Sequence, residues 1–259
     1  MSARARWVRF AHPQGREGFG TLDGGVVTVF DGDMFAGCEP TGETLALDAV
    51  ELLVPCTPTK VVALWNNLRA AADKQGLAAP KEPLYFIKPP SCLLADCGAV
   101  VRPASYAGRI LFEGELGVVI GTTCVDVDEA DVDDVVFGYT CVNDVTALDL
   151  IAADPSFAQW TRAKSFDTFG VVGPAIATGL DPDALVVTTS AGGRVRQEYP
   201  VSDMFFPPRR LVSLLSRDMT LVAGDVVACG TSLGAMPMRP GVPIEVTVEP
   251  VGTLTSTLA

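Results

Sequence analysis

The sequence is poor in basic residues and in histidine. Its 259 residues include 19 Lys or Arg against 31 Asp or Glu, which gives a formal net charge of −12. The sequence has a single histidine. The phosphates of nucleic acids repel such a chain, so nucleic acid is not an expected partner. One histidine leaves too few ligands for a Cys/His zinc site. The composition favours a hard cation bound by carboxylates and a small anionic substrate held through that cation.

Long uncharged runs are also absent. No stretch without a charged residue reaches the ~18 residues that a membrane-spanning helix needs, so no membrane partner is expected. The basic start of the chain runs into His12 and Pro13 without the apolar core of a signal peptide. The seven cysteines form no C-x-x-C pair, and several lie in apolar runs, which is typical of reduced core thiols. We therefore expect a cytoplasmic protein with seven free thiols.

Proline and glycine divide the chain into two parts. Residues 6–56 have the pattern of short strands joined by turns, and Asp23-Gly24-Gly25 is typical of a tight hairpin. Two prolines then precede a buried-strand pattern that begins at Lys60. We predict a small antiparallel N-terminal module over residues 1–57 and a second domain over residues 58–259.

The second part is rich in strand patterns and has few helical ones. A helical composition is found at residues 67–76, and further helices are predicted near 127–136, 146–153 and 207–217. This mixture does not fit a doubly wound α/β sheet. The predicted fold class is mixed but predominantly β, with short helices on the outside.

The segment 112–120 carries two informative carboxylates. If it forms a strand, Glu113 and Glu115 share one face, while Leu116 and Val118 point to the other. Neighbouring carboxylates repel each other unless they are solvated or neutralised, and Mg²⁺ prefers oxygen ligands. The segment fits a cation site, and it fits an ordinary solvent-facing strand as well.

Three further features could carry chemistry. Asp144 follows a buried-strand pattern and is either a ligand fixed by the strand end or the N-cap of the next helix. Lys164 lies among aromatic residues, where it either aims its charge at an anionic substrate or pairs with Asp167 at the surface. The glycine-bounded turn 230–234 either brings backbone N–H groups close to a carboxylate or enolate, or is only a tight loop.

Together these segments resemble the fumarylacetoacetate hydrolase family over roughly residues 59–258. Four motifs in the family's order carry the resemblance: E-x-E with V-V-I-G at 113–121, G-Y-x-x-x-N-D at 138–144, R-x-K-x-x-D-T-F at 162–169, and G-D-x-x-x-x-G-T at 224–231. Four ordered motifs are far more specific than any one of them, so the chain is identified as a member. The short leading module has counterparts among the family's bacterial members.

The resemblance implies a divalent-metal enzyme that acts on 2-oxo acids or β-diketone acids, with the family's β-sandwich roll in a homodimer. By position it assigns Mg²⁺, with Mn²⁺ or Ca²⁺ as alternative ions, to Glu113, Glu115 and Asp144. Lys164 and Thr168 match positions that touch the metal-bound substrate, which makes Lys164 the catalytic candidate. Thr231 matches the threonine of the family's substrate-facing turn.

Two departures from the family pattern lie on the substrate side. The lid motif G-x-N-Y-x-x-H-x-x-E has Ala70 here in place of the His and Asp73 in place of the Glu. The motif N-D-x-[ST]-x-R ends in Leu148, so an Arg that often contacts substrate is missing. Arg69 is the candidate to hold the distal carboxylate of the substrate instead. We predict that residues 67–75 form a lid helix that orders over the site when substrate binds.

These departures bear on the reaction. An alanine cannot move a proton, so hydrolysis, which needs a deprotonated water, is weakened most, and Asp73 is left as the candidate base. Decarboxylation or keto–enol isomerisation needs mainly the electron sink that Mg²⁺ supplies. We therefore predict a Mg²⁺-dependent enzyme for a small acylpyruvate- or oxaloacetate-like acid, with decarboxylation or isomerisation preferred over C–C hydrolysis. A metal-binding pseudo-enzyme is the alternative, and the retained Lys164 and Thr168 argue against it.

Overall fold

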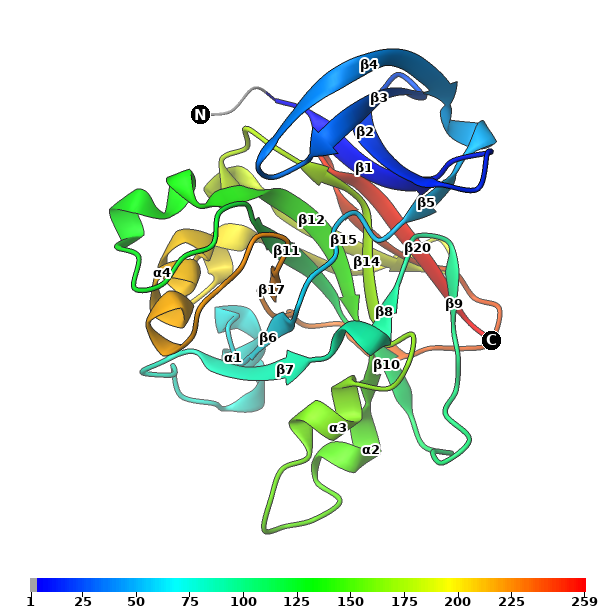
Figure 1. Cartoon of the computed structure of the whole chain (residues 1–259). Helices are drawn as coiled ribbons and strands as arrows, with labels where there is room; N and C mark the ends of the chain where they lie inside the picture. The colour runs from blue at the N-terminus through cyan, green and yellow to red at the C-terminus, as the bar shows by residue number, and fades with distance from the viewer. Residues whose placement is uncertain (1–3) are drawn as a thin grey trace.

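The computed structural model describes residues 4–259, so the first three residues of the predicted N-terminal module lie outside the described residues. That module is built from β1 (Arg6–Ala11), β2 (Glu17–Asp23), β3 (Val26–Asp33), β4 (Gly37–Ala46) and β5 (Glu51–Leu53). All pairs among them are antiparallel, and Gly24 and Gly25 form the predicted hairpin turn with φ of +52° and +82°. The small antiparallel module at the top of Figure 1 is therefore confirmed.

The module's strands continue into the main sheet of the second part, because β1 pairs with β14 (Gly170–Ala177). Beyond β14 the sheet runs through β12 (Val136–Asp144), β11 (Gly114–Ile120), β17 (Val226–Ala228), β6 (Val61–Trp65) and the edge strand β7 (Leu84–Lys88). The short β8 (Leu93–Leu94) pairs with β14. Every residue of β11 is buried, as expected for a central strand that is covered on both faces.

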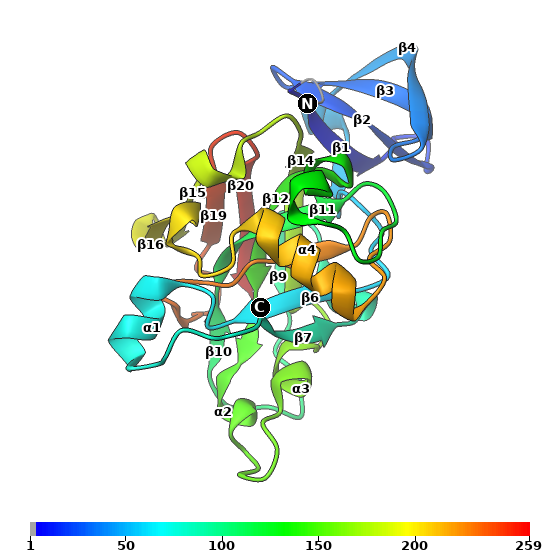
Figure 2. The same ribbon diagram turned by 90° about the vertical axis from the view of Figure 1, so that its left-hand side faces the viewer.

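Two smaller sheets accompany the main one. One has the order β16 (Arg194–Pro200), β15 (Val186–Ala191), β19 (Ile244–Val248), β20 (Gly252–Leu258) and β9 (Gly98–Val100), and Figure 2 shows most of it beside β12 and β14. The other joins β13 (Thr146–Ala147), β10 (Ile110–Phe112) and β18 (Met236–Pro237). The predicted strand 112–120 is thus wrong in one respect: the chain leaves the small sheet and enters the main sheet at Glu113.

The helices are few and short. They are α1 (Arg69–Gln75), α2 (Leu148–Ile151), α3 (Trp160–Lys164) and α4 (Pro208–Asp218), with 3₁₀ turns at Leu47–Ala49, Pro90–Cys92, Glu129–Asp134, Pro182–Ala184 and Val201–Asp203. The predicted helices at 67–76 and 207–217 are confirmed, and α1 ends at Gly76 in the left-handed conformation. The helix predicted near 127–136 is a 3₁₀ turn rather than an α-helix. The helix predicted near 146–153 was too long, because its first two residues form β13.

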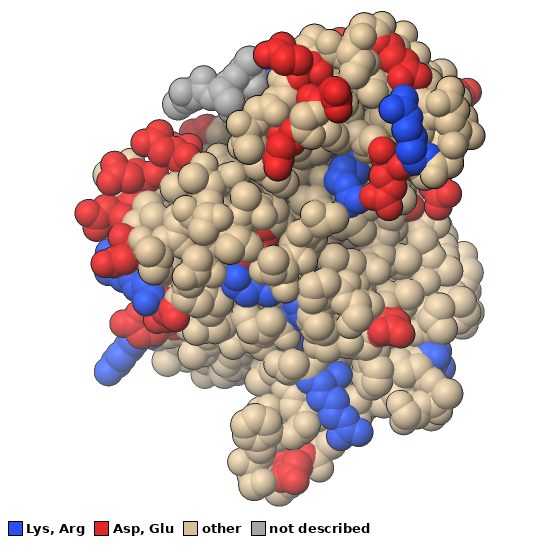
Figure 3. Space-filling model, in the orientation of Figure 1, with Lys and Arg blue, Asp and Glu red and all other residues tan. Residues whose placement is uncertain are grey.

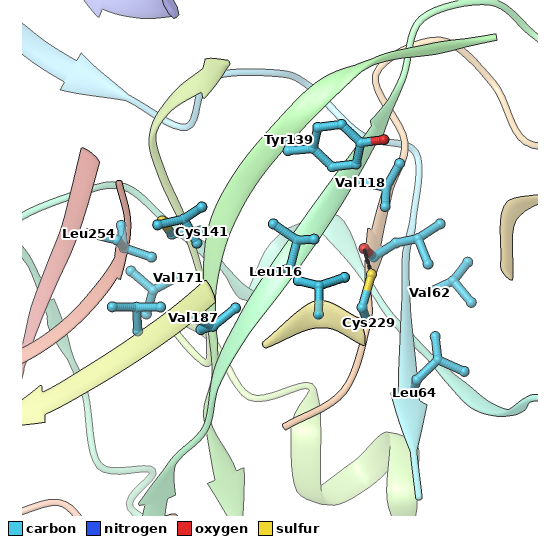
Figure 4. Packing of buried hydrophobic residues seen from close by; sticks show 14 of the residues in the cluster. Val62, Leu64, Leu116, Val118, Tyr139, Cys141, Val171, Val187, Cys229 and Leu254 are labelled. Atoms are coloured by element: carbon cyan, nitrogen blue, oxygen red, sulfur yellow. Dashed lines mark hydrogen bonds between the residues drawn. The ribbon is translucent and has the colours of Figure 1, made fainter. Parts of the chain in front are cut away.

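The apolar core lies where the main sheet meets the sheet of β15, β19 and β20. Figure 4 shows Leu116 of β11 between Val62 of β6 on one side and Val187 and Leu254 on the other. All four side chains are buried. The predominantly β architecture with short helices is therefore confirmed, and it holds β11 and β12 rigidly at its centre.

The surface reflects the acidic composition. Figure 3 shows carboxylate side chains gathered over the N-terminal module and over the neighbouring segment at 129–134, with wide uncharged areas between them. Among the described residues, no helix combines the length and the apolar character that crossing a membrane requires.

The seven cysteines are all unpaired in the structure. Five are buried, and burial raises the pKa of Cys56 and of Cys141 to about 12, so these thiols resist reaction in the folded protein. Only Cys97 is exposed, and Cys38 is half-buried. We expect a thiol reagent to modify these two first in the native protein and all seven in denatured, unreduced protein. Five or fewer reactive thiols after denaturation would contradict this prediction.

Candidate metal centre and substrate cavity

Three carboxylates converge at the end of the β11–β12 strand pair. Gly114 is paired with Asn143 across the two antiparallel strands, so Glu115 on β11 and Asp144 at the end of β12 lie close together. Glu113 lies next to them, where the chain crosses between sheets. One oxygen of each carboxylate lies within 4.8 Å of the others, which is an arrangement that could hold a metal ion. The expected convergence is present, and the solvent-facing alternative for this segment was wrong.

The environment of Glu115 fits a cation. Its side chain is completely buried, and its Oε2 accepts a hydrogen bond of 2.8 Å from the backbone N–H of Gly230. Its Oε1 is also buried but has no hydrogen-bond partner. Burial, and then the negative charge of Asp144, raise the pKa of Glu115 well above its usual range. A metal ion would give this oxygen the partner it lacks and would stabilise the ionised form.

Two buried lysines accompany the carboxylates. The Nζ of Lys164 lies 2.7 Å from Glu113 Oε2 and 2.5 Å from Asp144 Oδ2, and the Nζ of Lys88 lies 2.6 Å from Asp144 Oδ1. Lys164 is only 2% exposed, so the alternative of a surface lysine paired with Asp167 was wrong. The N-cap alternative for Asp144 was also wrong, because its strand leads into β13 and α2 starts later, at Leu148.

No sequence motif singled out Lys88. It ends the edge strand β7 and is completely buried, and its ammonium group also donates to the backbone carbonyls of Lys164 and Phe169. The only signal in the sequence is a lysine placed directly after an apolar strand pattern and before Pro89 and Pro90.

The charges of this cluster balance in a particular way. Burial alone would raise the pKa of Asp144, but the ammonium groups of Lys164 and Lys88 lower it below its usual range. Burial lowers the pKa of Lys164, and the charges of Asp144 and Glu113 more than reverse this, so Lys164 stays protonated. When a divalent ion binds and Glu115 is ionised, the ion and two ammonium groups would face three carboxylates, a balance of 4 − 3 = +1. The loaded site would attract an anion.

A cavity of about 320 Å³ opens above this cluster. Glu113 and Lys164 line it, while Glu115 and Asp144 lie behind them. The remaining wall is largely apolar and includes Trp65, Phe86, Leu111, Leu148, Ile151 and Trp160. Phe86 stacks on Trp160 with ring centres 5.7 Å apart, and Lys164 Nζ lies 5.3 Å from the centre of the Phe86 ring. Lys164 is the one cationic side chain among the lining residues.

Comparison with known proteins identifies the family. Residues 60–259 match the model described as fumarylacetoacetate (FAA) hydrolase C-terminal, and residues 5–55 match the model described as Rv2993c-like, N-terminal. The chain belongs to the fumarylacetoacetate hydrolase family. The predicted division after residue 57 lies between the two matched segments and remains a prediction.

Several fumarylacetoacetate hydrolase relatives have similar sequences and structures. Protein Rv2993c of Mycobacterium tuberculosis is 38% identical over 219 residues, which cover 83% of this chain and 81% of that protein. Oxaloacetate tautomerase YisK of Bacillus subtilis is 35% identical over 225 residues, which cover 82% of this chain and 74% of the relative. The crystal structure of 5-carboxymethyl-2-hydroxymuconate delta-isomerase from Mycobacterium smegmatis has a TM-score of 0.90 and 36% identity, and the match covers 98% of this chain and 99% of that one.

The family's threonine turn lies at the cavity, as expected. Thr231 lines the cavity and donates a hydrogen bond of 3.0 Å to the carbonyl of Gly114, between the two glutamates. Buried Gln197 holds the turn in place, because its Nε2 donates to Thr231 Oγ1 at 2.8 Å and to the carbonyl of Ser232 at 2.9 Å. Its Oε1 accepts from the N–H of Gly114 at 3.0 Å. No sequence motif pointed to Gln197.

The family's lid segment forms α1 at the edge of the cavity. Ala71 and Gln75 line the cavity from this helix, whereas Arg69 and Asp73 are exposed and are not among the lining residues. Arg69 donates to the carbonyl of Met204 at 2.8 Å instead. The helix predicted at 67–75 is confirmed as Arg69–Gln75, while its closure on substrate and the roles of Arg69 and Asp73 remain predictions.

Thr168 also lies outside the cavity lining. Its backbone has a φ of +69°, and its hydroxyl accepts a hydrogen bond of 2.8 Å from the N–H of Val101. This contact fixes the loop after β9 against the segment that carries Lys164. A role of Thr168 in binding substrate remains a prediction.

Proposed function

We propose that this protein is a Mg²⁺-dependent isomerase that interconverts the keto and enol forms of a small 2-oxo acid. The buried charge cluster below the cavity supports this proposal, because its three carboxylates and two ammonium groups would carry a net positive charge once a divalent ion is bound. A site of this kind stabilises the extra negative charge of the enolate more than the neutral 2-oxo group from which it forms. Mn²⁺ or Ca²⁺ could occupy the same oxygen ligands.

The ion would be held by Glu113, Glu115 and Asp144, and would supply Lewis-acid stabilisation of the enolate oxygen. Lys164 stays protonated, so it would hold the substrate carboxylate or enolate through a fixed ammonium group rather than act as a base. Thr231 lines the same cavity, so its hydroxyl would contact the bound substrate. The rings of Phe86 and Trp160 exclude water from one wall and thereby strengthen these polar contacts.

The lid supports isomerisation over hydrolysis. Among the lining residues there is no imidazole, and Ala70 occupies the position at which the family pattern has its His. The names of two relatives agree with this choice, since one is an oxaloacetate tautomerase and the other a delta-isomerase. Decarboxylation uses the same electron sink and is the competing reaction to measure, and C–C hydrolysis is the weaker alternative. The homodimer and the cytoplasmic location remain predictions.

The substrate class follows from the lining of the cavity. Glu113 and Lys164 fit a carboxylate next to a 2-oxo group, which can reach both Lys164 and a bound ion. The lining also includes Trp65, Leu148 and Trp160 and contains no arginine, so it fits an uncharged substituent better than a second carboxylate. Oxaloacetate and an acylpyruvate are therefore the two substrates to compare.

The test is a spectrophotometric assay of enol absorbance with both acids, in Mg²⁺ and in EDTA. We expect Mg²⁺-dependent enol–keto exchange, with slow acylpyruvate hydrolysis. Ala70→His should raise that hydrolysis by up to roughly 10²–10⁴-fold if Asp73 orients the new imidazole. The matched control Ala79→His, in the exposed loop after α1, should leave it unchanged. Wild-type acylpyruvate hydrolysis near ~10 s⁻¹, a usual enzyme rate, would contradict the proposal, as would exchange that persists in EDTA.

A further inference from the structure

A second cavity, of about 370 Å³, lies on the other side of the β10–β18 strand pair. Because side chains alternate along a strand, Leu111 and Glu113 face the substrate cavity, whereas Phe112 lines the second one. Three arginines also line it: Arg194, Arg196 and Arg239. It shares no lining residue with the substrate cavity.

Local strand geometry gathers two of these arginines. Figure 2 shows β15, β16 and β19 side by side. In the β15–β16 hairpin the register shifts, because Thr189 is opposite Gln197 while Ser190 is opposite Val195. Arg196 is the extra residue of this β-bulge, and a bulge redirects the side chain it carries. Arg194 and Arg196 both line the cavity, as residues two apart on a strand commonly share one face. Arg239 reaches it from the segment after β18.

The charges around this cavity are unbalanced. Among the described residues, none of the three guanidinium groups makes an ion pair or a side-chain hydrogen bond, and no carboxylate lines the cavity. By contrast, Arg209 on α4 contacts the carboxylates of Asp133, Asp181 and Asp183. In a chain with 31 acidic residues against 19 basic ones, three arginines without an acidic partner around one hollow are unexpected. An anion that enters the hollow would offset their mutual repulsion.

We propose that this cavity is a second anion-binding site, for a small anion that carries two or three carboxylate or phosphate groups. The planar guanidinium group binds both kinds of oxygen in a bidentate manner, and three of them exceed what a monovalent anion can engage. Phe112 and Ile244 give the cavity an apolar wall against which a short carbon skeleton can pack. The volume is within the usual range for a small-molecule site, about 300–1,000 Å³.

The site adjoins the substrate-facing turn without being part of it. Arg196 directly precedes Gln197, whose side chain holds Thr231 and Gly114. The backbone carbonyl of Arg196 also lies so close to Gly234 that a Cβ there would be only 1.9 Å from it. An anion held by Arg196 would therefore rest on the same strand that positions the turn.

The test is isothermal titration of metal-free protein at constant ionic strength, with citrate, pyrophosphate and acetate in separate arms. We expect one citrate or pyrophosphate to bind per chain with a Kd below ~1 mM, and the stronger of the two identifies the preferred head group. Acetate should bind far more weakly. Arg196→Gln should weaken binding about tenfold or more, because it removes charge-assisted hydrogen bonds. Arg217→Gln, which removes the same charge from α4, is the matched control and should leave binding unchanged.

Several results would overturn the proposal. One is the absence of saturable citrate or pyrophosphate binding up to ~10 mM, and another is equal binding by Arg196→Gln and wild type. A third is an equal loss of affinity in Arg196→Gln and Arg217→Gln, which would show non-specific attraction. The three arginines are exposed, so their substitution should not unfold the chain. If light scattering shows that Arg196→Gln changes the molar mass in solution, the arginines serve a contact between copies of the chain and the proposal is wrong. Because binding is measured without metal or substrate, these outcomes do not depend on the proposed isomerase activity.

Discussion

Replacing Glu115 with Gln should lower the affinity for Mg²⁺ by at least about 100-fold and reduce metal-dependent turnover with it, while metal-free protein stays as stable as wild type or becomes more stable. The amide keeps the size of the side chain and can still accept the hydrogen bond from Gly230. It cannot take a negative charge, so the oxygen that lacks a partner in the wild type loses its attraction for a cation.

The pH dependence of this variant follows from the raised pKa of Glu115. Folded protein holds the proton of Glu115 more tightly than unfolded protein, because burial and the charge of Asp144 disfavour the ionised carboxylate. This contribution to stability is complete below the ordinary value of 4.5 and is lost progressively as the pH rises above it. In EDTA, the melting temperature of wild type should therefore fall more steeply between about pH 5 and 8 than that of Glu115→Gln.

The same proton explains how metal binding should depend on pH. Mg²⁺ must displace the proton from Glu115, so its affinity for wild type should rise with pH and calorimetry should detect proton release. Glu245→Gln is the matched control, since Glu245 accepts a hydrogen bond from Ser190 and lies outside the cluster. It should change neither the melting curves nor the metal affinity. A Glu115→Gln variant that binds Mg²⁺ as tightly as wild type would exclude Glu115 as a ligand.

Of the substitutions proposed here, Lys88→Met should lower the free energy of unfolding most, by about 3–5 kcal/mol, because it removes one partner of a buried ion pair. Asp144 Oδ1 would lose the ammonium group 2.6 Å away, and the carbonyls of Lys164 and Phe169 would lose a donor. A loss of this size lowers the melting temperature by roughly 6–20 °C for a chain of this length. Thermal unfolding followed by circular dichroism, with and without Mg²⁺, measures it.

Lys60→Met provides a matched control for this substitution. Lys60 also forms a short ion pair, 2.5 Å from Asp225 Oδ2. However, Asp225 keeps hydrogen bonds from the N–H and hydroxyl of Thr59 and from the N–H of Val222 when that lysine is lost. The side chain of Lys60 is also 20% exposed, so its loss should cost about 1 kcal/mol or less. Equal destabilisation by the two variants would show that Lys88 has no special place in the cluster.

The three carboxylates have local signals in the sequence, and the family's ordered motifs then selected the metal site over the solvent-facing strand and the N-cap. Glu113 and Glu115 are two residues apart at the start of an apolar run, and Asp144 ends another such run. Antiparallel pairing of the two strands then brings them together. Lys164 was found only through the family motif, because its own surroundings in the sequence also fit a surface lysine.

The residues that sequence patterns missed depend on contacts between distant segments. The ammonium group of Lys88 contacts the carbonyls of Lys164 and Phe169, which follow it by 76 and 81 residues in the chain. Gln197 reaches the threonine turn from a different sheet, 34 residues away from Thr231. The predicted helix at 146–153 was too long for a similar reason, since Thr146 and Ala147 pair with β10. No local pattern encodes these partners.

The metal ligands and the cavity wall have different origins in the chain. All three carboxylates lie on β11, β12 and the residue before them, and only residues 121–135 connect these two strands. The wall around the substrate is assembled from segments spread between Leu64 and Ala235. The ligand set is therefore a local unit that one strand pairing creates, whereas the wall requires the whole domain. Substitutions in the wall can alter which acid fits while the ion-binding unit is inherited unchanged, and this separation allows one scaffold to diverge into enzymes for many substrates.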